Sequence, residues 1–401
     1  MVPSMRAGKY VTQPNNYRAF IPAGLPPDPP IQMDAEMTRL LSDADRALGR
    51  LDGVATVLPN PNLFVAMYVR HEAVLSSQIE NTQSTLEDLL QFEAERKIQG
   101  HRPKDVEEVV NYVAAMNHGM QRLGELPLSL RLLREIHAKL LEGTRGSERN
   151  PGEFRTTQNW IGSQGCNLQD AEYVPPPSHE MHKALDNLEK FLHDRSSLPV
   201  LIHCGLAHAQ FETIHPFLDG NGRVGRLLIT LLLCERGILQ RPLLYLSYYL
   251  KAHRAQYYDR LTAVRHDGDW EGWLRFFLRG VYEVSQAATE TARSILQLRE
   301  SHRQLIIERL SGTANGLKLL DHLFEHPVIS IRDAQQELEC AYVTANNVVN
   351  QLVDLNILKE ITGQERNRLY RYNPYYALFS QQALPPSDSE GDSDSTAAVD
   401  L

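Results

Sequence analysis

Two apolar helical segments joined by a short glycine-containing turn constrain the fold of this chain more than any other feature. Residues 200–213 read VLIHCGLAHAQFET, and residues 224–236 contain the run LLITLLLC. A helix that is apolar on nearly every side must be buried among other elements. We therefore expect a mainly helical protein whose turn at residues 215–223 is held by two core helices.

The turn has the composition of an anion-binding site. Gly220 and Gly222 flank Asn221 where the second helix begins. Glycines let backbone N–H groups approach an anion closely, and a helix N-terminus attracts phosphate through its unpaired N–H groups and its dipole. Asn221 tolerates unusual backbone angles and can donate hydrogen bonds.

The charged residues of the turn indicate phosphate chemistry. Arg223 and Arg226 share one face of the first helical turn, where cations are unfavourable unless an anion binds. Asp219 is a suitable oxygen ligand for Mg²⁺, and His215 can accept a proton from an attacking hydroxyl near neutral pH. Taken singly, such a histidine or Gly-Asn-Gly turn is usually structural. Together they indicate phosphoryl or nucleotidyl transfer.

Composition excludes several other classes of protein. The 401 residues predict two or three domains, and the net charge of -9 argues against general binding of polyanions. The four cysteines show no metal-binding or paired spacing, which favours a reducing compartment. They are Cys166, Cys204, Cys234 and Cys340. The first residues lack a signal-peptide pattern, and no apolar run is long enough to span a bilayer, so we expect a cytoplasmic protein without a membrane partner.

The chain divides into five expected regions. They are an extended N-terminal arm (1–33), an N-terminal helical region (34–110), a catalytic core (111–300), a winged-helix domain (310–380) and a disordered acidic tail (381–401). Prolines keep the run IPAGLPPDPP from being helical, and the tail has almost nothing to bury.

Apolar periodicity predicts the helices. They are expected at 34–48, 63–79, 106–123, 129–141, 181–192, 200–213, 224–236, 270–298, 317–324, 331–338 and 343–355. A further helix is expected to run through Leu89, Leu90 and Phe92. Residues 154–177 predict a β-hairpin or an ordered loop, and residues 359–373 predict a two-stranded wing.

The turn resembles the signature of a known family. HPFLDGNGRVGR, residues 215–226, is similar to the Fic motif HPFx[DE]GNGRxxR at each specified position. The likeness extends over about residues 30–380. It implies a mainly helical Fic-type fold with a β-hairpin flap, and the transfer of AMP from ATP to a Ser, Thr or Tyr hydroxyl of a target protein.

The resemblance also implies a role for each residue of the turn. His215 would be the general base, and Asp219 would bind Mg²⁺ at the α- and β-phosphates. The nucleotide-binding set would be Gly220, Asn221, Gly222, Arg223, Val224, Gly225 and Arg226. A kinase relative carries Lys in place of the second glycine, so Gly222 argues against that branch. Relatives that transfer other nucleotidyl groups or phosphocholine stay open.

An upstream element resembles the family's inhibitory motif [ST]xxxE[GN]. Ser76, Glu80 and Asn81 match it at the end of a predicted helix. Taken alone, this is an ordinary helix end with a solvated glutamate. The resemblance implies that Glu80 pairs with Arg226 and so prevents productive ATP binding. The same glutamate could instead position a water for removal of AMP.

Two further elements resemble parts of the family's site. The stretch FRTTQNWIGSQ resembles the flap that pairs with a target segment through an exposed edge. Its candidate contact residues are Asn159, Trp160, Ile161 and Gly162, with a plain surface hairpin as the alternative. Tyr257 and Tyr258 could flank an adenine, with burial in a helix core as the alternative. Arg265 stands where some relatives have Asn.

The C-terminal region resembles a winged helix. Its predicted second helix, residues 343–355, carries no Lys or Arg, although contacts to DNA phosphates need basic residues. The basic candidates are confined to the wing: Lys359, Arg366, Arg368 and Arg371. Packing or dimerisation is therefore favoured over DNA binding. A DNA-binding regulator that senses nucleotide is the rival function, self-modification is a further outcome, and a homodimer is an expected assembly because relatives tie such helices to dimer contacts.

Overall fold

The computed structural model describes residues 5–56, 61–95, 104–144, 146–162, 165–195, 197–310 and 312–380. Its N-terminal and central helices are α1 (Ala35–Thr56), α2 (Pro61–Ile79), α3 (Leu86–Glu95), α4 (Lys104–Leu123), α5 (Leu130–Leu140), α6 (Ser178–His193), α7 (Val200–Ile214) and α8 (Asn221–Glu235). They are followed by α9 (Ser247–Ala252), α10 (Arg254–Asp267), α11 (Trp270–Arg309), α12 (Thr313–Glu325), α13 (Ile331–Leu338), α14 (Tyr342–Asp354) and α15 (Asn373–Ser380). The strands are β1 (Gly8–Thr12), β2 (Arg18–Pro22), β3 (Val328–Ser330), β4 (Leu358–Glu360) and β5 (Leu369–Tyr372). The predicted disordered tail, residues 381–401, lies outside the described residues.

Helices α7 and α8 form the centre of the core. Every side chain of α7 from Leu201 to Ile214 is buried, as are those of α8 from Arg223 to Leu233. The mainly helical fold predicted from this apolar pair is confirmed. Helix α8 begins at Asn221, three residues earlier than predicted, because Gly220 adopts a left-handed conformation and starts the helix there.

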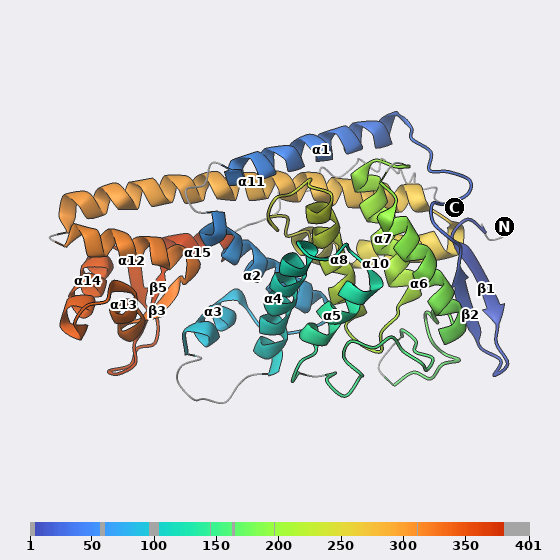
Figure 1. The fold of residues 1–401 in the computed structure, drawn as a ribbon, viewed down its shortest axis with the longest axis horizontal. Coiled ribbons are helices and arrows are strands. Elements are labelled where there is room, and N and C mark those ends of the chain that lie inside the picture. The colour runs from blue at the N-terminus through green and yellow to red at the C-terminus, as the bar shows by residue number, and fades with distance from the viewer. Residues whose placement is uncertain are drawn as a thin grey trace, which may run out of the picture.

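Helix α11 is the long axis of the molecule. It runs for 40 residues, and α1 lies alongside it (Figure 1). Its last turns reach the C-terminal region, beyond the predicted end at residue 298. The expected boundary between residues 110 and 111 falls inside α4, so the two regions that it separates share one continuous helix.

The N-terminal segment is not simply an extended arm. Strands β1 and β2 form an antiparallel hairpin that pairs Gly8 with Pro22 and Thr12 with Arg18. Phe20 is fully buried, and its N–H donates to the carbonyl of Val174 at 2.9 Å. The hairpin is therefore packed against the segment that leads into α6.

The C-terminal region combines three short helices with a three-stranded antiparallel sheet of order β3-β5-β4. This arrangement fits the predicted winged helix, which stays a prediction. Helix α15 was not expected. Its Phe379 ring lies edge-on to the Tyr68 ring of α2 with centroids 5.3 Å apart, so the region packs against the helix that leads to Glu80.

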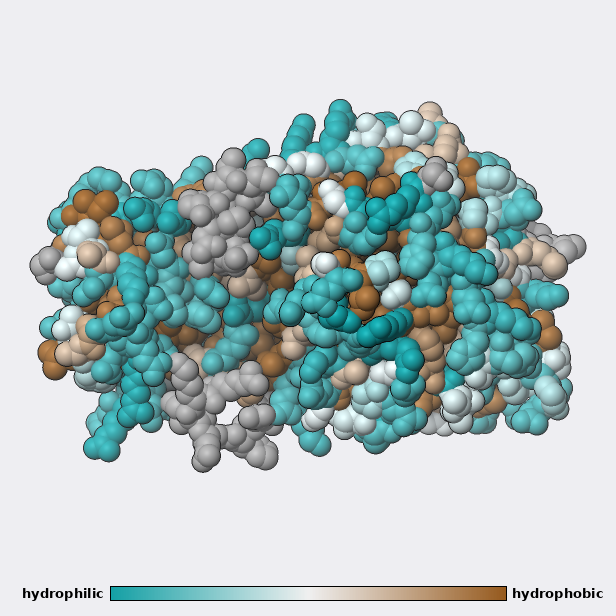
Figure 2. Space-filling view, in the orientation of Figure 1, coloured by the Kyte–Doolittle hydropathy of each residue, from teal (hydrophilic) through white to brown (hydrophobic). Residues whose placement is uncertain are grey.

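Hydrophilic side chains cover most of the face in Figure 2, and apolar atoms are visible mainly between them. Among the described residues, no helix combines the length and the apolarity needed to cross a bilayer.

Candidate active site at the start of helix α8

Two left-handed residues bracket the turn between α7 and α8. His215 has φ 50° and ψ 60°, and its N–H donates to the carbonyl of Phe211 at 2.9 Å. Gly220 has φ 76°. A left-handed residue ends a helix sharply, and a non-glycine residue held there indicates local constraint. The turn therefore leaves α7 and enters α8 with a fixed path.

Asn221 holds this path with its side chain. Its Oδ1 accepts from the N–H of Phe217 at 2.8 Å, and its Nδ2 donates to the carbonyl of Phe217 at 2.9 Å. These two bonds use the amide oxygen and one of the two N–H groups of the side chain. Asn221 therefore keeps the turn in shape.

His137 of α5 contacts the backbone and the Phe217 ring of the turn, a role that the sequence did not indicate. Its Nδ1 accepts from the N–H of Gly152 at 2.8 Å, so its Nε2 carries the proton and donates to the carbonyl of Asp219 at 3.0 Å. Its ring stacks on Phe217 with centroids 3.8 Å apart. Burial lowers the pKa of His137 to about 4, so the neutral form persists at physiological pH.

His215, the candidate general base, has a lowered pKa. Its burial in the turn, with a smaller contribution from the Arg155 guanidinium, lowers its pKa to about 4. The imidazole is consequently neutral at physiological pH and can accept a proton without first losing one.

The first arginine, Arg223, is buried against α4. Its Nη1 lies 3.4 Å from Oε2 of Glu108, and its Nη2 lies 3.7 Å from Oδ1 of Asp219. Thr82 also donates to Oε2 of Glu108 at 3.2 Å. Glu108 thus orients the guanidinium. This role could not be predicted, because an acidic residue on a helix usually faces solvent.

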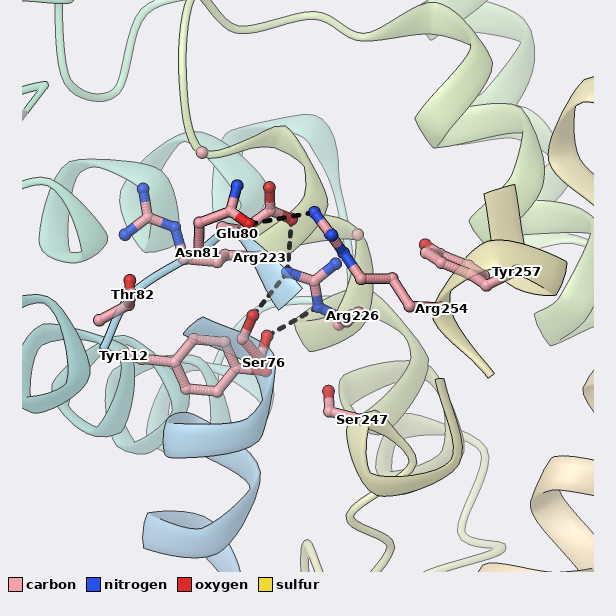
Figure 3. Close-up of polar contacts among 12 residues, drawn as sticks. Ser76, Glu80, Asn81, Thr82, Tyr112, Arg223, Arg226, Ser247, Arg254 and Tyr257 are labelled. Carbon is pink, nitrogen blue, oxygen red and sulfur yellow. Dashed lines mark hydrogen bonds and ion pairs between the residues drawn. The ribbon is translucent and has the colours of Figure 1, made fainter. Parts of the chain in front are cut away.

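The second arginine, Arg226, is held by the end of α2 (Figure 3). Its Nε donates to Oγ of Ser76 at 2.7 Å, and its Nη2 donates to the carbonyl of Ser76 at 3.0 Å and to Oε1 of Glu80 at 2.8 Å. The Arg226 side chain is only 2% exposed. The structure therefore brings together the inhibitory-motif residues and the last motif arginine.

The Glu80 carboxylate lies at the predicted anion-binding position, against Gly222. A Cβ atom placed on Gly222 would lie 2.3 Å from Oε1 of Glu80, so this oxygen rests directly on the second glycine of the turn. Burial acts to raise the pKa of Glu80, but Arg226 and Arg223 outweigh it and hold the pKa below its ordinary value. A negative charge from the protein itself therefore sits at the N-terminus of α8.

Asp219 is the candidate metal ligand. Its side chain is 42% exposed, and its Oδ1 accepts from the N–H of Gly220 at 2.6 Å. The described residues contain no cluster of three or more side chains able to hold a metal ion. One accessible carboxylate still fits Mg²⁺, which commonly takes one or two carboxylates and completes its shell with phosphate oxygens and water.

The flap is an ordered loop closed by one antiparallel bridge, between Ile161 and Tyr173. Asn159 points to the turn, donating to the carbonyl of Phe217 at 2.9 Å. Trp160 and Ile161 are 42% and 39% exposed, and the bridge leaves them at the surface. Gly162 follows them, where a Cβ would lie 2.6 Å from Sγ of Cys166. Of the two predicted alternatives, a β-hairpin and an ordered loop, the segment is thus the ordered loop.

The two tyrosines of α10 differ. The Tyr257 ring is buried, and its hydroxyl donates to Nε2 of His208 at 2.9 Å, while Nδ1 of His208 donates to the carbonyl of Gly225 at 2.8 Å. Tyr257 is therefore a core residue and presents no face to a base. Tyr258 is 40% exposed, and the Arg254 guanidinium lies 5.6 Å from its ring centroid. Val224, also in the predicted nucleotide set, is fully buried.

Comparisons with known proteins agree with this geometry. Residues 38–121 match the Fic/DOC family N-terminal region, and residues 127–233 match the Fic/DOC family. The chain is 30% identical over 202 residues to a protein adenylyltransferase Fic of Culex quinquefasciatus, covering 49% of this chain and 36% of that protein. It is 28% identical over 199 residues to the protein of the same name from Drosophila grimshawi, covering 49% and 38%. The chain thus spans little more than a third of these curated relatives.

A solved structure shares the fold. A Fic family protein from Desulfovibrio desulfuricans G20 is 20% identical with a TM-score of 0.53, over 86% of this chain and 97% of that one. The helical core is thus that of a Fic-type fold. The chain belongs to the Fic/DOC family, with both the N-terminal and the core region of the family present.

Proposed function

We propose that this protein transfers AMP from ATP to a hydroxyl side chain of a target protein. The observation that carries the proposal is a neutral His215 on a turn that opens into a helix N-terminus, with Arg223 and Arg226 on the first helical turn. The name of its relatives, protein adenylyltransferase Fic, supports the same reaction. The target is a protein with an accessible Ser, Thr or Tyr.

The residues supply a balanced reaction. His215 takes the proton of the target hydroxyl while that oxygen attacks the α-phosphorus of ATP. The bond from the α-phosphorus to the bridging oxygen breaks, and pyrophosphate leaves with its electron pair. The N–H groups of Gly220 and Gly222 and the two arginines neutralise the phosphate chain. Mg²⁺, which Asp219 would hold, supplies further charge neutralisation at the phosphates.

Replacing the base tests this assignment. In the Glu80→Gly chain, His215→Ala should abolish labelling of proteins by α-labelled ATP, while ATP binding measured by calorimetry stays within a few-fold. General-base catalysis contributes about 10²–10⁴-fold, which is enough to remove detectable labelling. Full labelling by the variant would refute the role of His215.

We further propose that Glu80 inhibits this reaction. Its carboxylate pairs with Arg226 at 2.8 Å and rests on Gly222, so a triphosphate must displace a negative charge from both partners. A second candidate function is the reverse reaction, in which Glu80 positions a water for removal of AMP from modified targets. It is supported because Glu80 and His215 are close enough to influence each other's pKa.

One comparison separates addition from removal. Release of AMP from a pre-modified target is measured with the unaltered chain and with Glu80→Gly. If removal dominates, release is lost in the variant; if Glu80 is purely inhibitory, the unaltered chain releases no AMP.

DNA binding is less well supported. Arg371, one of the basic candidates of the wing, donates to Oε1 of Glu87 on α3 at 2.6 Å and is thus already paired. Lys359, Arg366 and Arg368 are exposed. A gel-shift assay at moderate salt should show no retarded complex. In the same preparations, intact mass spectrometry measures self-modification. Light scattering measures dimer formation.

A further inference from the structure

Arg155 is a buried cation that contacts the turn around His215. The proposed reaction gives it no role. It lies in the segment between α5 and α6, and it is 1% exposed. Burying a guanidinium is costly unless its donors are satisfied. Among the described residues, every hydrogen bond of this guanidinium goes to a backbone carbonyl, and none goes to a carboxylate.

Those carbonyls belong to two different parts of the site. On the turn, Nε donates to the carbonyl of His215 at 3.0 Å, and Nη2 donates to that of Ile214 at 3.4 Å. On the flap segment, Nη1 donates to the carbonyl of Thr157 at 3.3 Å, and Nη2 donates to that of Pro176 at 2.6 Å. One rigid planar group therefore joins the start and the end of the flap to the end of α7.

The backbone of the same residue adds a further tie. The N–H of Arg155 donates to the carbonyl of Pro216 at 2.9 Å. The carbonyls of Ile214 and His215 are at the C-terminus of α7, where the negative end of the helix dipole stabilises a cation. His215 itself is left-handed, with φ 50°, and a non-glycine residue stays in that region only when its surroundings fix it.

We propose that Arg155 is a positioning residue that fixes the backbone of His215 and locks the flap to the catalytic turn. This inference rests on the proposed AMP transfer, because it assigns a role within that reaction. Arg155 does not act on the nucleotide directly. Its loss should lower kcat and leave the KM for ATP nearly unchanged, since a displacement of about 1 Å at a reacting group costs up to about 100-fold.

The charge of Arg155 provides a second, independent readout. It is the largest charge contribution to the lowered pKa of His215, with Arg265 acting in the same direction and Glu80 opposing them. Arg155→Gln removes the positive charge and should raise the pKa of His215. Arg155→Lys keeps the charge but cannot reach all four carbonyls, so it should leave the pKa low and still lower kcat.

The chain offers a matched control. Arg236 is a partly buried arginine, with a side chain 7% exposed, that donates from Nη2 to the carbonyls of Leu192 and Asp194 at 2.7 Å each, at the end of α6. Unlike Arg155, it also pairs with a carboxylate, that of Glu235 at 3.2 Å. It joins backbone segments in the same way but lies outside the catalytic turn. Arg236→Gln reports the purely structural cost of losing such a contact.

The test uses the full chain with Glu80→Gly as background, so that transfer is measurable. We expect kcat to fall at least tenfold in Arg155→Gln and in Arg155→Lys, with the KM for ATP within about twofold. NMR titration of the His215 imidazole should show a higher pKa in Arg155→Gln alone.

Defined outcomes would overturn the inference. A fall in kcat no larger than that in Arg236→Gln refutes it. If Arg155→Gln does not fold, the same comparison of kcat is made between Arg155→Lys and Arg236→Gln. If the background chain transfers no AMP at all, the proposed function fails instead. In that case, the imidazole titration still tests the contact, and an unchanged pKa in Arg155→Gln contradicts it.

Discussion

At the scale of single residues, the turn between α7 and α8 depends on side chains that hold its backbone. Asn221 and His137 are both satisfied by backbone atoms of the turn. The sequence indicated the turn itself, because glycine, arginine and histidine stand close together there. It could not indicate His137, Glu108 or Arg155, since each lies far away in the chain and has an ordinary local environment.

The pair of tyrosines gives a prediction at this scale. Tyr258→Leu should weaken ATP binding by the Glu80→Gly chain several-fold, because the exposed ring is the one able to stack on a base. Tyr257→Phe is the matched control. It removes only the hydrogen bond to His208, so it should cost about 1 kcal/mol of stability and leave ATP affinity unchanged. Calorimetric titration with ATP and thermal unfolding measure both, and equal losses of affinity would contradict the distinction.

At the scale of elements, the end of α2 determines where Glu80 lies. Asn81 has φ 67°, and its left-handed conformation directs the chain away from the helix immediately after Glu80. This conformation explains physically why glycine or asparagine follows the glutamate in the inhibitory motif. The sequence located this helix correctly from its apolar periodicity.

A substitution at Asn81 tests the importance of this helix end. Asn81→Val places a β-branched residue in the left-handed region, at a cost of about 1–2 kcal/mol, so the chain relaxes and Glu80 moves away from Arg226. AMP transfer should rise by up to about tenfold. Asn81→Gly also loses the side-chain contact with Arg254 but keeps the backbone angle, so its transfer rate should equal that of the unaltered chain. Equal rates in both variants would show that the backbone angle does not matter.

Other elements were harder to predict from local sequence. The β1–β2 hairpin was missed because the proline-rich run after it dominates the local pattern, and its stabilising partner, Val174, is more than 150 residues away. For the flap, the local sequence did not separate a β-hairpin from an ordered loop, and the structure has an ordered loop with a single bridge. Helix α15 escaped prediction because its eight residues form only two turns, and packing against α2 stabilises them.

At the scale of the whole molecule, many imidazoles are buried in the neutral form. Burial lowers the pKa of five histidines to about 4: His71, His137, His203, His208 and His215. Two buried carboxyls, Glu72 and Glu212, have a pKa raised to about 7, which acts in the opposite direction. Between pH 6.5 and pH 4 the unfolded chain therefore binds more protons than the folded chain.

This imbalance predicts acid sensitivity. Stability rises with pH wherever the unfolded state binds more protons, so it must fall as the pH drops below 6.5. The free energy of unfolding should be lower at pH 5 than at pH 7.5 by about 3–5 kcal/mol. Urea titrations at the two pH values measure the difference. A protein that is more stable at pH 5 would contradict the burial of neutral imidazoles.

The most direct test of the account is mass spectrometry of the Glu80→Gly chain after incubation with ATP, Mg²⁺ and cell lysate. The central claim is that the N-terminus of α8 is a binding site for a triphosphate and that the Glu80 carboxylate occupies this site. We predict an AMP adduct on a hydroxyl side chain that is strongly increased over the unaltered chain and absent with Glu80→Gly combined with His215→Ala. Equal or lower modification by Glu80→Gly would contradict the inhibitory role, and an adduct that persists without His215 would contradict the site itself.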